Sequence, residues 1–271
     1  MKPTLFPRVL LFAAATVFTF TFTACGGSDD DDTPVTPVPE PEPEPELQDE
    51  TYTVGGVQFK MVAVTGGTFL MGNTSGDSDE KPLHSVTLSD YHIGQTEVTQ
   101  ALWQAVTGSN PAYFVDASKP VERVSWNECQ EFITKLNQLT GKTFRLPTEA
   151  EWEFAARGGL KSRGYVYSGS NEIDNVAWYK NNSSSQTHKV ATKAPNELGL
   201  YDMSGNVWEW CADWYGTYSH EAQTDPTGPD TGVRRVLRGG SWGYDDTSVT
   251  YRYYSLPTES KNINYGLRLA L

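Results

Sequence analysis

Residues 160–235 contain no long segment with helical or strand periodicity, and this absence constrains the fold more than any other feature of the chain. Gly, Asn, Ser, Asp and Pro dominate the stretch. Loops of that length are uncommon in a compact domain unless metal ions, disulfides or aromatic anchors fix them. Aromatic anchors are abundant, and all eight tryptophans lie within residues 51–271: Trp103, Trp126, Trp152, Trp178, Trp208, Trp210, Trp214 and Trp242.

The first half of the domain carries clear helix signals. They predict helices over about 100–107, 126–140 and 149–157. A Ser or Thr followed three residues later by Glu satisfies two free backbone N–H groups at a helix start, and a glycine commonly ends the helix. The signals are the N-cap Thr99, the capping boxes Ser125–Glu128 and Thr148–Glu151, and the closing glycines Gly108, Gly141 and Gly158.

Short β-rich runs occupy the remainder. Two runs within 53–71 are separated by Gly66–Gly67, which suggests a hairpin. Two more flank Ser89–Asp90, and others are expected at 234–237, 250–254 and 267–271. Few helices, many short strands and long ordered loops indicate an irregular α+β domain. One domain accommodates residues 51–271.

Three motifs carry a resemblance to a known family. They read RLPTEAEWEFAARGG at 145–159, GLYDMSGNVWEW at 199–210 and RGGSW at 238–242. Together they resemble the formylglycine-generating enzyme (sulfatase-modifying factor) family over roughly residues 53–271. The resemblance implies the complex α+β fold of that family, which is similar to an elaborated C-type lectin fold.

The same resemblance raises a question about catalysis. Family enzymes hold copper with two cysteines shortly after the GGSW-like motif, and the equivalent positions fall near Tyr244 and Val249. Residues 238–271 contain no cysteine. Copper(I) selects soft thiolate ligands, and Cys129 and Cys211 belong to other motifs, where we expect two separate buried thiols. We therefore expect no copper and no catalytic residues, while an oxidase acting on a sulfatase cysteine or serine through another centre stays open as an alternative.

Asp202 and Glu209 form a candidate metal site. Two carboxylates on either side of a glycine-containing loop can wrap a hard cation with oxygen ligands, which Ca²⁺ prefers. The resemblance implies as ligands the Asp202 side chain, the Gly205 and Val207 carbonyls and the Glu209 carboxylate. The alternative is that these polar groups only satisfy buried loop amides.

A second family calcium site would begin at Asn175 and Val176. The loop that follows is shorter than in the family and has no acid, so Asn182 would have to substitute as a ligand. The alternative to this calcium site is a loop without metal that is held only by its own hydrogen bonds.

The segment that lacks cysteine is rich in aromatic and acidic residues instead. Tyrosine and tryptophan beside aspartate are typical of recognition surfaces. Alternate residues of the strand at 250–254 must face inward, and Arg252 matches a family arginine expected in a buried ion pair. The candidate ligand-binding residues, for a protein or glycan partner, are Trp242, Tyr244, Asp245, Asp246, Tyr251 and Tyr253.

The C-terminal segment suggests one further hypothesis about function. Some lectin-fold proteins diversified by retroelements end in RGGSW, a variable stretch and then G-x-R-L, and this chain is similar over 238–269. A retroelement-diversified receptor is therefore a variant of the binding hypothesis.

The N-terminus is typical of an exported lipoprotein. Lys2 and Arg8 precede an apolar run that is too short for a spanning helix. It ends in a loose lipobox over 22–25, which predicts a signal peptide at 1–24 and a lipid on Cys25. An ordinary secretory signal cleaved near Ala24 is the alternative.

Residues 25–50 are expected to be a disordered spacer of alternating Pro and Glu. Acidic residues directly after the cysteine resemble the surface-export signal of Bacteroidetes lipoproteins, so we expect an outer-membrane, surface-exposed protein held to the membrane by its lipid. The chain has a net charge of −13, and ten acids lie in 26–50 without a base, so the domain itself is only mildly acidic. No basic cluster favours nucleic acid as a partner.

Overall fold

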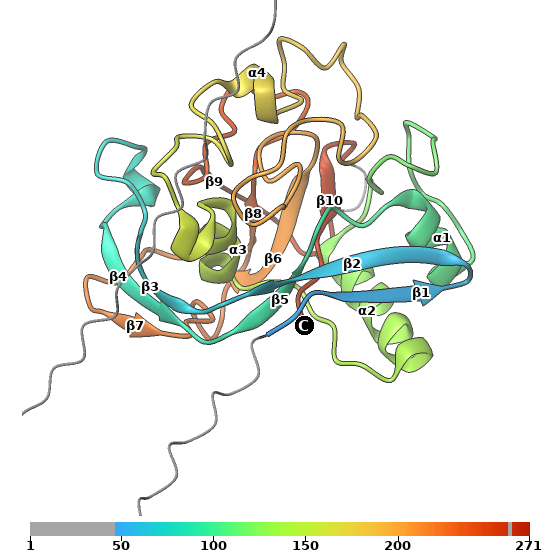
Figure 1. The fold of residues 1–271 in the computed structure, drawn as a ribbon, viewed down its shortest axis with the longest axis horizontal. Helices are drawn as coiled ribbons and strands as arrows, with labels where there is room; N and C mark the ends of the chain where they lie inside the picture. The colour runs from blue at the N-terminus through green and yellow to red at the C-terminus, as the bar shows by residue number, and fades with distance from the viewer. Residues whose placement is uncertain (1–46, 260–261) are drawn as a thin grey trace, which may run out of the picture. The chain divides into compact units, whose positions relative to one another are not determined.

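The computed structural model describes residues 47–259 and 262–271 (Figure 1). The expected signal peptide, Cys25 and nearly all of the spacer lie outside the described residues. The folded part begins slightly before residue 51, because strand β1 starts at Glu50 and Asp49 forms a 2.7 Å ion pair with Lys60.

Three small sheets make up the framework. The first has the order β1–β2–β5, formed by antiparallel strands β1 (Glu50–Val54), β2 (Val57–Val64) and β5 (Tyr91–Gly94). Its free edge at β5 is covered by the end of the chain. The N–H of His92 donates to the Leu271 carbonyl at 3.1 Å, and the Leu271 N–H donates back at 3.0 Å.

The second sheet has the order β3–β4–β7, formed by β3 (Gly67–Met71), β4 (His84–Leu88) and β7 (Gln223–Thr224). The hairpin expected within 53–71 is wrong, because β2 pairs with β1 and β5 whereas β3 pairs with β4. Gly66 lies where the chain passes from one sheet to the other. A Cβ at Gly66 would lie 2.1 Å from the Leu88 carbonyl oxygen, so this crossing requires glycine.

The third sheet has the order β10–β6–β8–β9. It contains β6 (Trp208–Trp214), β8 (Arg235–Arg238), β9 (Arg252–Ser255) and β10 (Tyr265–Leu267). Strand β10 runs parallel to β6, and the other pairs are antiparallel. The sheet therefore brings the WEW motif beside both C-terminal strands.

The three predicted helices are confirmed as α1 (Gln100–Thr107), α2 (Trp126–Thr140) and α3 (Glu149–Ala156). Ser125 and Thr148 form the capping boxes expected of them, and Gly108 and Gly141 end their helices in the left-handed conformation. Three shorter helical turns complete the described structure: α4 (Ile173–Val176), η1 (Ser78–Glu80) and η2 (Gly159–Lys161).

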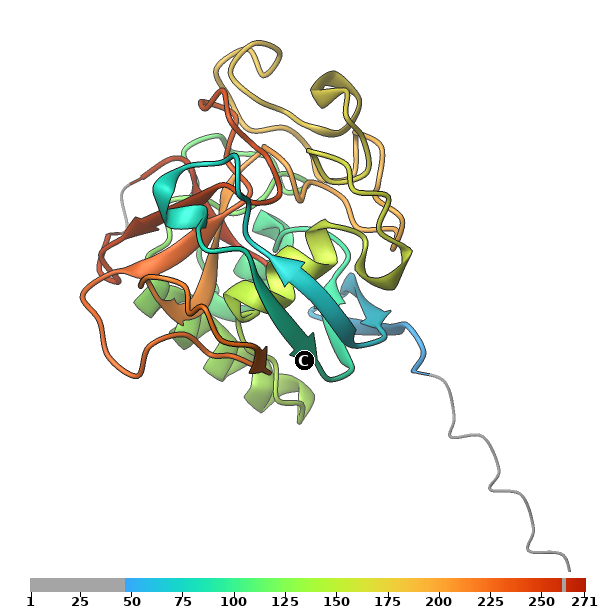
Figure 2. The same cartoon turned by 90° about the vertical axis from the view of Figure 1, so that its left-hand side faces the viewer.

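Tryptophans anchor the interior as expected. The side chains of Trp152, Trp208 and Trp210 are completely buried, and Trp103 stacks on Phe132 with ring centroids 4.8 Å apart. The loops around α4 lie on one side of the domain and α2 on the other, in both cartoon views (Figures 1 and 2). This arrangement leaves the long loops next to the ends of β6, β8 and β9.

Candidate functional site: an aromatic face and a buried acidic loop

Three tyrosines gather over one buried tryptophan. The ring centroids of Tyr244, Tyr251 and Tyr253 lie 5.3, 5.6 and 5.1 Å from that of Trp208. Trp208 is inaccessible to solvent, whereas each tyrosine is partly exposed. We call Tyr244, Tyr251, Tyr253 and the neighbouring Trp242 the aromatic face.

Trp242 extends this face toward the loop after α1. Its ring packs edge-on against Phe114 at 5.5 Å, and its indole N–H donates to the Ile263 carbonyl at 3.2 Å. Both partners come from other segments than the tyrosines. The aromatic face is thus held by three separate segments, which contain Trp208, Phe114 and Ile263.

The two predicted acids lie at the exposed rim. Asp245 pairs with Lys180 at 2.5 Å, with both side chains more than half exposed. Asp246 is exposed and accepts the Ser248 N–H at 2.9 Å. Exposed pairs of this kind contribute about 0–1 kcal/mol to stability, so these carboxylates remain available to a partner.

The tyrosine hydroxyls are not poised as bases. Burial, and then a hydrogen bond with Tyr253, raises the pKa of Tyr244 to about 12. Its phenol therefore stays neutral at physiological pH and serves as a hydrogen-bonding and packing group.

Strand β9 separates two environments, as its alternation predicts. Tyr253 points to the aromatic face, while Arg252 is buried on the opposite side. The Arg252 guanidinium donates to both carboxylate oxygens of Glu149, at 2.6 and 2.8 Å. The expected buried ion pair of Arg252 is confirmed.

Cys129 and Cys211 are both buried and free, as expected. Burial raises the pKa of each thiol well above its ordinary value. Cys129 packs in one core cluster and Cys211 in the other. The positions near Tyr244 and Val249 carry no thiol.

The loop from Asp202 to Glu209 has a strained backbone. Asp202, Gly205 and Asn206 all have positive φ, of 59°, 84° and 58°. A Cβ at Gly205 would lie 2.4 Å from the Trp178 carbonyl oxygen, so only glycine fits. Within residues 47–259 and 262–271, no backbone N–H donates to the carbonyl of Gly205 or Val207.

Asp202 has an unpaired oxygen. Its Oδ2 accepts the Ala191 N–H at 2.8 Å, but its buried Oδ1 has no hydrogen-bond partner among the residues the structure describes. Burial, opposed in part by the Ala191 hydrogen bond, raises the pKa of Asp202 to about 6. An orphaned buried carboxylate oxygen is a position where a cation would be stabilised.

Glu209 is placed differently from the expectation. Its carboxylate accepts the Trp152 indole N–H at 2.6 Å and three contacts from Arg268 at 2.6–3.1 Å. All three side chains are completely buried. In this geometry Glu209 is an ion-pair partner, and it presents no free oxygen to a metal.

Glu97 is a residue of this site that sequence reasoning missed. Its carboxylate accepts the Asn206 side-chain amide at 2.8 Å and the Val207 N–H at 3.1 Å. Burial, and then the charges of Asp202 and Glu209, raises the pKa of Glu97 well above its usual range.

The charges of this buried loop do not balance. Glu97, Asp202 and Glu209 face a single buried cation, Arg268. When all are ionised, two negative charges remain, which a divalent cation would neutralise. A Ca²⁺ ion at this loop would have the unpaired Asp202 oxygen and the carbonyls of Gly205 and Val207 as its candidate ligands, whereas both Glu97 oxygens already accept hydrogen bonds. In the described part of the chain, no three His, Cys, Asp or Glu side chains form a metal-binding group, so such a site depends on the carbonyls.

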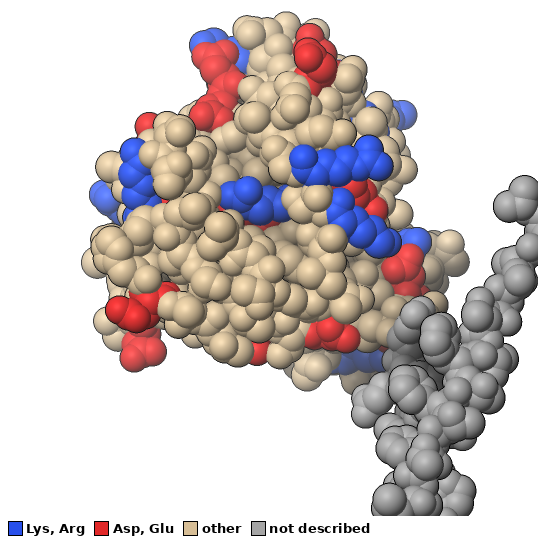
Figure 3. Space-filling model, turned by 60° about the vertical axis from the view of Figure 1, so that its left-hand side comes forward, with Lys and Arg blue, Asp and Glu red and all other residues tan. Residues whose placement is uncertain are grey.

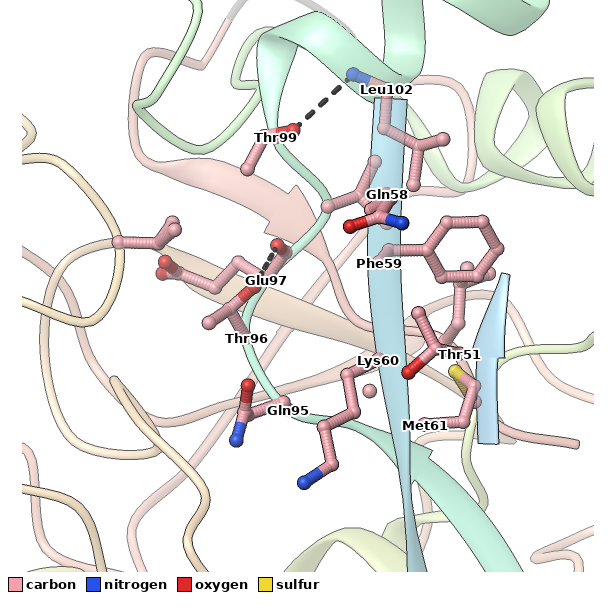
Figure 4. A pocket seen from close by; sticks show the side chains of 14 residues that line it. Thr51, Gln58, Phe59, Lys60, Met61, Gln95, Thr96, Glu97, Thr99 and Leu102 are labelled. Carbon is pink, nitrogen blue, oxygen red and sulfur yellow. Dashed lines mark hydrogen bonds between the residues drawn. The ribbon is translucent and has the colours of Figure 1, made fainter. Parts of the chain in front are cut away.

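A cavity of about 290 Å³ lies beside Glu97. It lies between β2 and the segment from Gln95 to Thr99, and Glu97 lines it together with Lys60 (Figure 4).

The second candidate metal position is held by protein groups. The Asn175 carbonyl accepts the Ala194 N–H at 3.0 Å, and Val176 is buried. Asn182 hydrogen-bonds Ala177 and Tyr179 within its own loop, at 3.0 and 2.9 Å. Asn182 also donates to the Asp174 carboxylate at 3.2 Å, so one carboxylate lies beside this position.

The surface carries mixed charge. On the face drawn in Figure 3, Lys and Arg side chains form a short band with Asp and Glu beside them, and most of the surface is uncharged. In the described residues, no helix is long and apolar enough to cross a bilayer.

The structure is thus an irregular α+β domain in which the strand that carries the WEW motif is buried and the long loops are anchored by tryptophans. Residues 56–271 match the family described as the sulfatase-modifying factor enzyme 1-like domain. The chain belongs to this family, and the expected fold class is confirmed.

Two relatives support the assignment. The chain is 37% identical to the chaperone protein LppX of Paenibacillus barcinonensis over 67% of this chain and 78% of that protein. It is 33% identical to the formylglycine-generating enzyme of Streptomyces coelicolor over 77% of this chain and 88% of the enzyme.

One solved structure has a similar fold. Treponema denticola variable protein 1 superposes with a TM-score of 0.76 and 37% identity, covering 82% of this chain and 98% of that protein.

Proposed function

We propose that this protein is a non-catalytic, calcium-stabilised lipoprotein domain that binds a protein or glycan through its aromatic face. The observation that carries the proposal is the set of partly exposed tyrosines packed on buried Trp208, in a segment without cysteine. Tyrosine offers a large contact area with few rotatable bonds.

The aromatic face rests on a rigid support, which favours its use as a binding surface. Trp208 is fixed in β6 between β10 and β8, and Trp242 is held by Phe114. Because these groups are already ordered, binding costs less side-chain entropy than it would on a flexible loop. The rim acids Asp245 and Asp246 favour ligands with donor groups or positive charge.

Calcium would act on the same structure. The loop that contains Asp202 leads directly into Trp208, so an ion held at this loop would fix the floor of the aromatic face. Its binding free energy would add to the stability of the folded domain.

The proposed location is the outer surface of a bacterial envelope. A lipid on Cys25 would attach the chain to the membrane, and an extended Pro-Glu spacer spans about 3.1 Å per residue, so residues 26–50 reach on the order of 75 Å. The relative named a chaperone favours a protein partner over a glycan.

A diversified receptor is the second candidate. The similarity to a protein named as variable supports it, because the aromatic face lies in the segment between RGGSW and G-x-R-L. A reverse-transcriptase gene next to a near-copy of this segment, differing at adenines, would favour this version. A neighbouring sulfatase gene would favour the oxidase instead.

A defined binding screen tests the proposal. The domain from residue 47 onward is applied to a glycan array and to a random peptide display library. We expect a selected ligand to lose at least tenfold in affinity with Tyr251→Ala and with the double variant Asp245→Asn/Asp246→Asn. The control Tyr165→Ala changes a partly exposed tyrosine of another loop and should bind normally. Equal loss in all three variants, or selected ligands indifferent to the face, contradicts it.

A further inference from the structure

A second cavity lies away from the aromatic face and the acidic loop. Its volume is about 230 Å³, and it is enclosed by the ends of β4 and β6, the start of α3 and two loops at 216–219 and 226–229. Its lining includes two polar side chains that are almost completely buried, Asp213 and His84, each 4% exposed. Neither belongs to the sites described above.

Asp213 is a buried carboxylate without a counter-ion. Its Oδ2 accepts the Glu149 N–H at 2.8 Å, and it forms no ion pair with any residue in 47–259 or 262–271. Burial, and then the charge of Glu149, raises the pKa of Asp213 to about 8. A buried charge that lacks a partner is costly, so the group either holds a proton or needs a cation beside it.

The other oxygen of Asp213 is kept close to the cavity. A Cβ at Gly228 would lie 3.0 Å from this Oδ1 and 2.9 Å from the Asp213 Cβ. Gly228 has a φ of +73°, a conformation that favours glycine, and it also lines the cavity. Gly228 therefore approaches the carboxyl group without a side chain of its own.

His84 supplies a second acceptor. Its Nδ1 lies 3.0 Å from the Pro82 carbonyl oxygen, which can only accept, so Nδ1 carries the hydrogen. In the tautomer with its hydrogen on Nδ1, the Nε2 atom is an acceptor, and the described residues provide it with no hydrogen-bond donor. The tilted Tyr218 ring, 4.9 Å away, fixes the orientation of the imidazole.

We propose that this cavity binds a primary ammonium group, such as the end of a lysine side chain or a small free amine. An ammonium carries one positive charge and three N–H donors, which match an unpaired carboxylate and a free imidazole nitrogen. The remaining space is bordered by Trp214, Pro226 and Pro229, which suits the methylene chain of such a ligand.

Other charged groups around Asp213 do not replace this ligand. Glu149 is itself paired with Arg238 and Arg252, and Arg235 contacts the Ala212 carbonyl and two tryptophan rings. The titratable groups that act on Asp213 or share its cavity are Glu149, Glu151, Arg252, Arg235, Arg145, Cys211, Tyr218 and His84.

The test uses n-butylammonium as the probe and three comparisons. Titration followed by calorimetry or protein NMR should detect n-butylammonium binding to the wild-type protein at pH 7. The neutral isostere n-butanol should bind at least tenfold more weakly. Tetramethylammonium, which has the charge but no N–H donor, should also be weaker. Binding should release protons, measured as a dependence of the heat on the buffer.

Asp213→Asn is the decisive variant. It keeps an acceptor for the Glu149 N–H and removes only the charge, so its melting temperature should equal or exceed that of the wild type. It should bind n-butylammonium at least tenfold more weakly, while the control Asp90→Asn, a surface change, should leave binding unaltered. Equal binding of n-butanol, no binding of n-butylammonium, or an unchanged affinity in folded Asp213→Asn each overturns the proposal. None of these outcomes depends on the aromatic face.

Discussion

The guanidinium of Arg268 and the carboxylate of Glu209 form a completely buried ion pair, with Nη2 and Oε1 2.6 Å apart. Arg268 also donates to the carbonyls of Gly94 and Tyr201, both at 2.8 Å. One side chain near the end of the chain thus joins β5, the acidic loop and the WEW strand.

Removing this arginine should destabilise the domain strongly. Arg268→Met leaves Glu209 buried without a counter-ion and frees two carbonyls, so we expect a loss of about 3–5 kcal/mol in the free energy of unfolding. Urea denaturation measures it. The control Arg163→Met removes an exposed arginine whose contact with Glu197 is 3.9 Å, and it should change stability by less than about 1 kcal/mol. Similar losses in both variants would show that the buried pair has no special role.

Calcium removal should lower the melting temperature. At a free Ca²⁺ concentration of a hundred times the dissociation constant, binding adds about 2.7 kcal/mol to stability. Differential scanning calorimetry with and without a chelator measures this difference. Asp202→Asn should abolish it and Asp90→Asn should preserve it. A wild-type protein that is indifferent to chelator would rule out the ion at this loop.

The same aspartate predicts a pH dependence. Burial raises the folded pKa of Asp202 to about 6, above the ordinary value of 3.8, so the folded state binds the proton more tightly than the unfolded chain. Its contribution is fully present below pH 3.8 and is lost as pH rises through 6. Chelated wild-type protein should therefore lose stability between about pH 4 and pH 6 relative to Asp202→Asn. Parallel stability curves for the two proteins would contradict the assignment.

The absence of cysteine after Trp242 predicts an inactive domain. The protein, incubated with copper and a peptide of the CxPxR type, should leave the peptide cysteine unmodified. Mass spectrometry of the peptide checks this result, with the Streptomyces enzyme as a positive control. Conversion of the cysteine to the aldehyde would establish an oxidase with a different centre.

Lipidation is tested at Cys25. Metabolic labelling with a fatty-acid analogue should mark the wild-type protein and not Cys25→Ser, which should leave the membrane fraction. A control change, Ser28→Ala, should keep the label. Soluble wild-type protein without lipid would instead indicate an ordinary secretory signal.

Local signals in the sequence were sufficient for the helices. The capping boxes at Ser125 and Thr148 act within four residues of the helix start, so no tertiary information was needed to find α2 and α3. Strand β6 was missed because nearly all of its residues are buried and it carries Glu209 and Asp213 inside, which hides the alternation typical of a strand. The hairpin at Gly66 was wrong because partner choice depends on the whole fold.

In the candidate site, too, local sequence patterns identify some residues, whereas others are brought together only by the fold. The aromatic residues after RGGSW could be found from composition, and Asp202 from its motif. Glu97 could not, because it is 110 residues from Val207 in the chain and no local pattern links them. The pairing of Glu209 with Arg268 depends on β10 lying beside β6, which the sequence does not indicate.

The pairing of Leu271 with His92 has a consequence for the order of events during folding. The segment that covers β5 lies far from it in the sequence, so this edge of the first sheet stays open until two distant segments meet. Contacts of such long sequence separation slow folding. We therefore expect the pairing between His92 and Leu271 to form late, after the local helices and hairpins are in place.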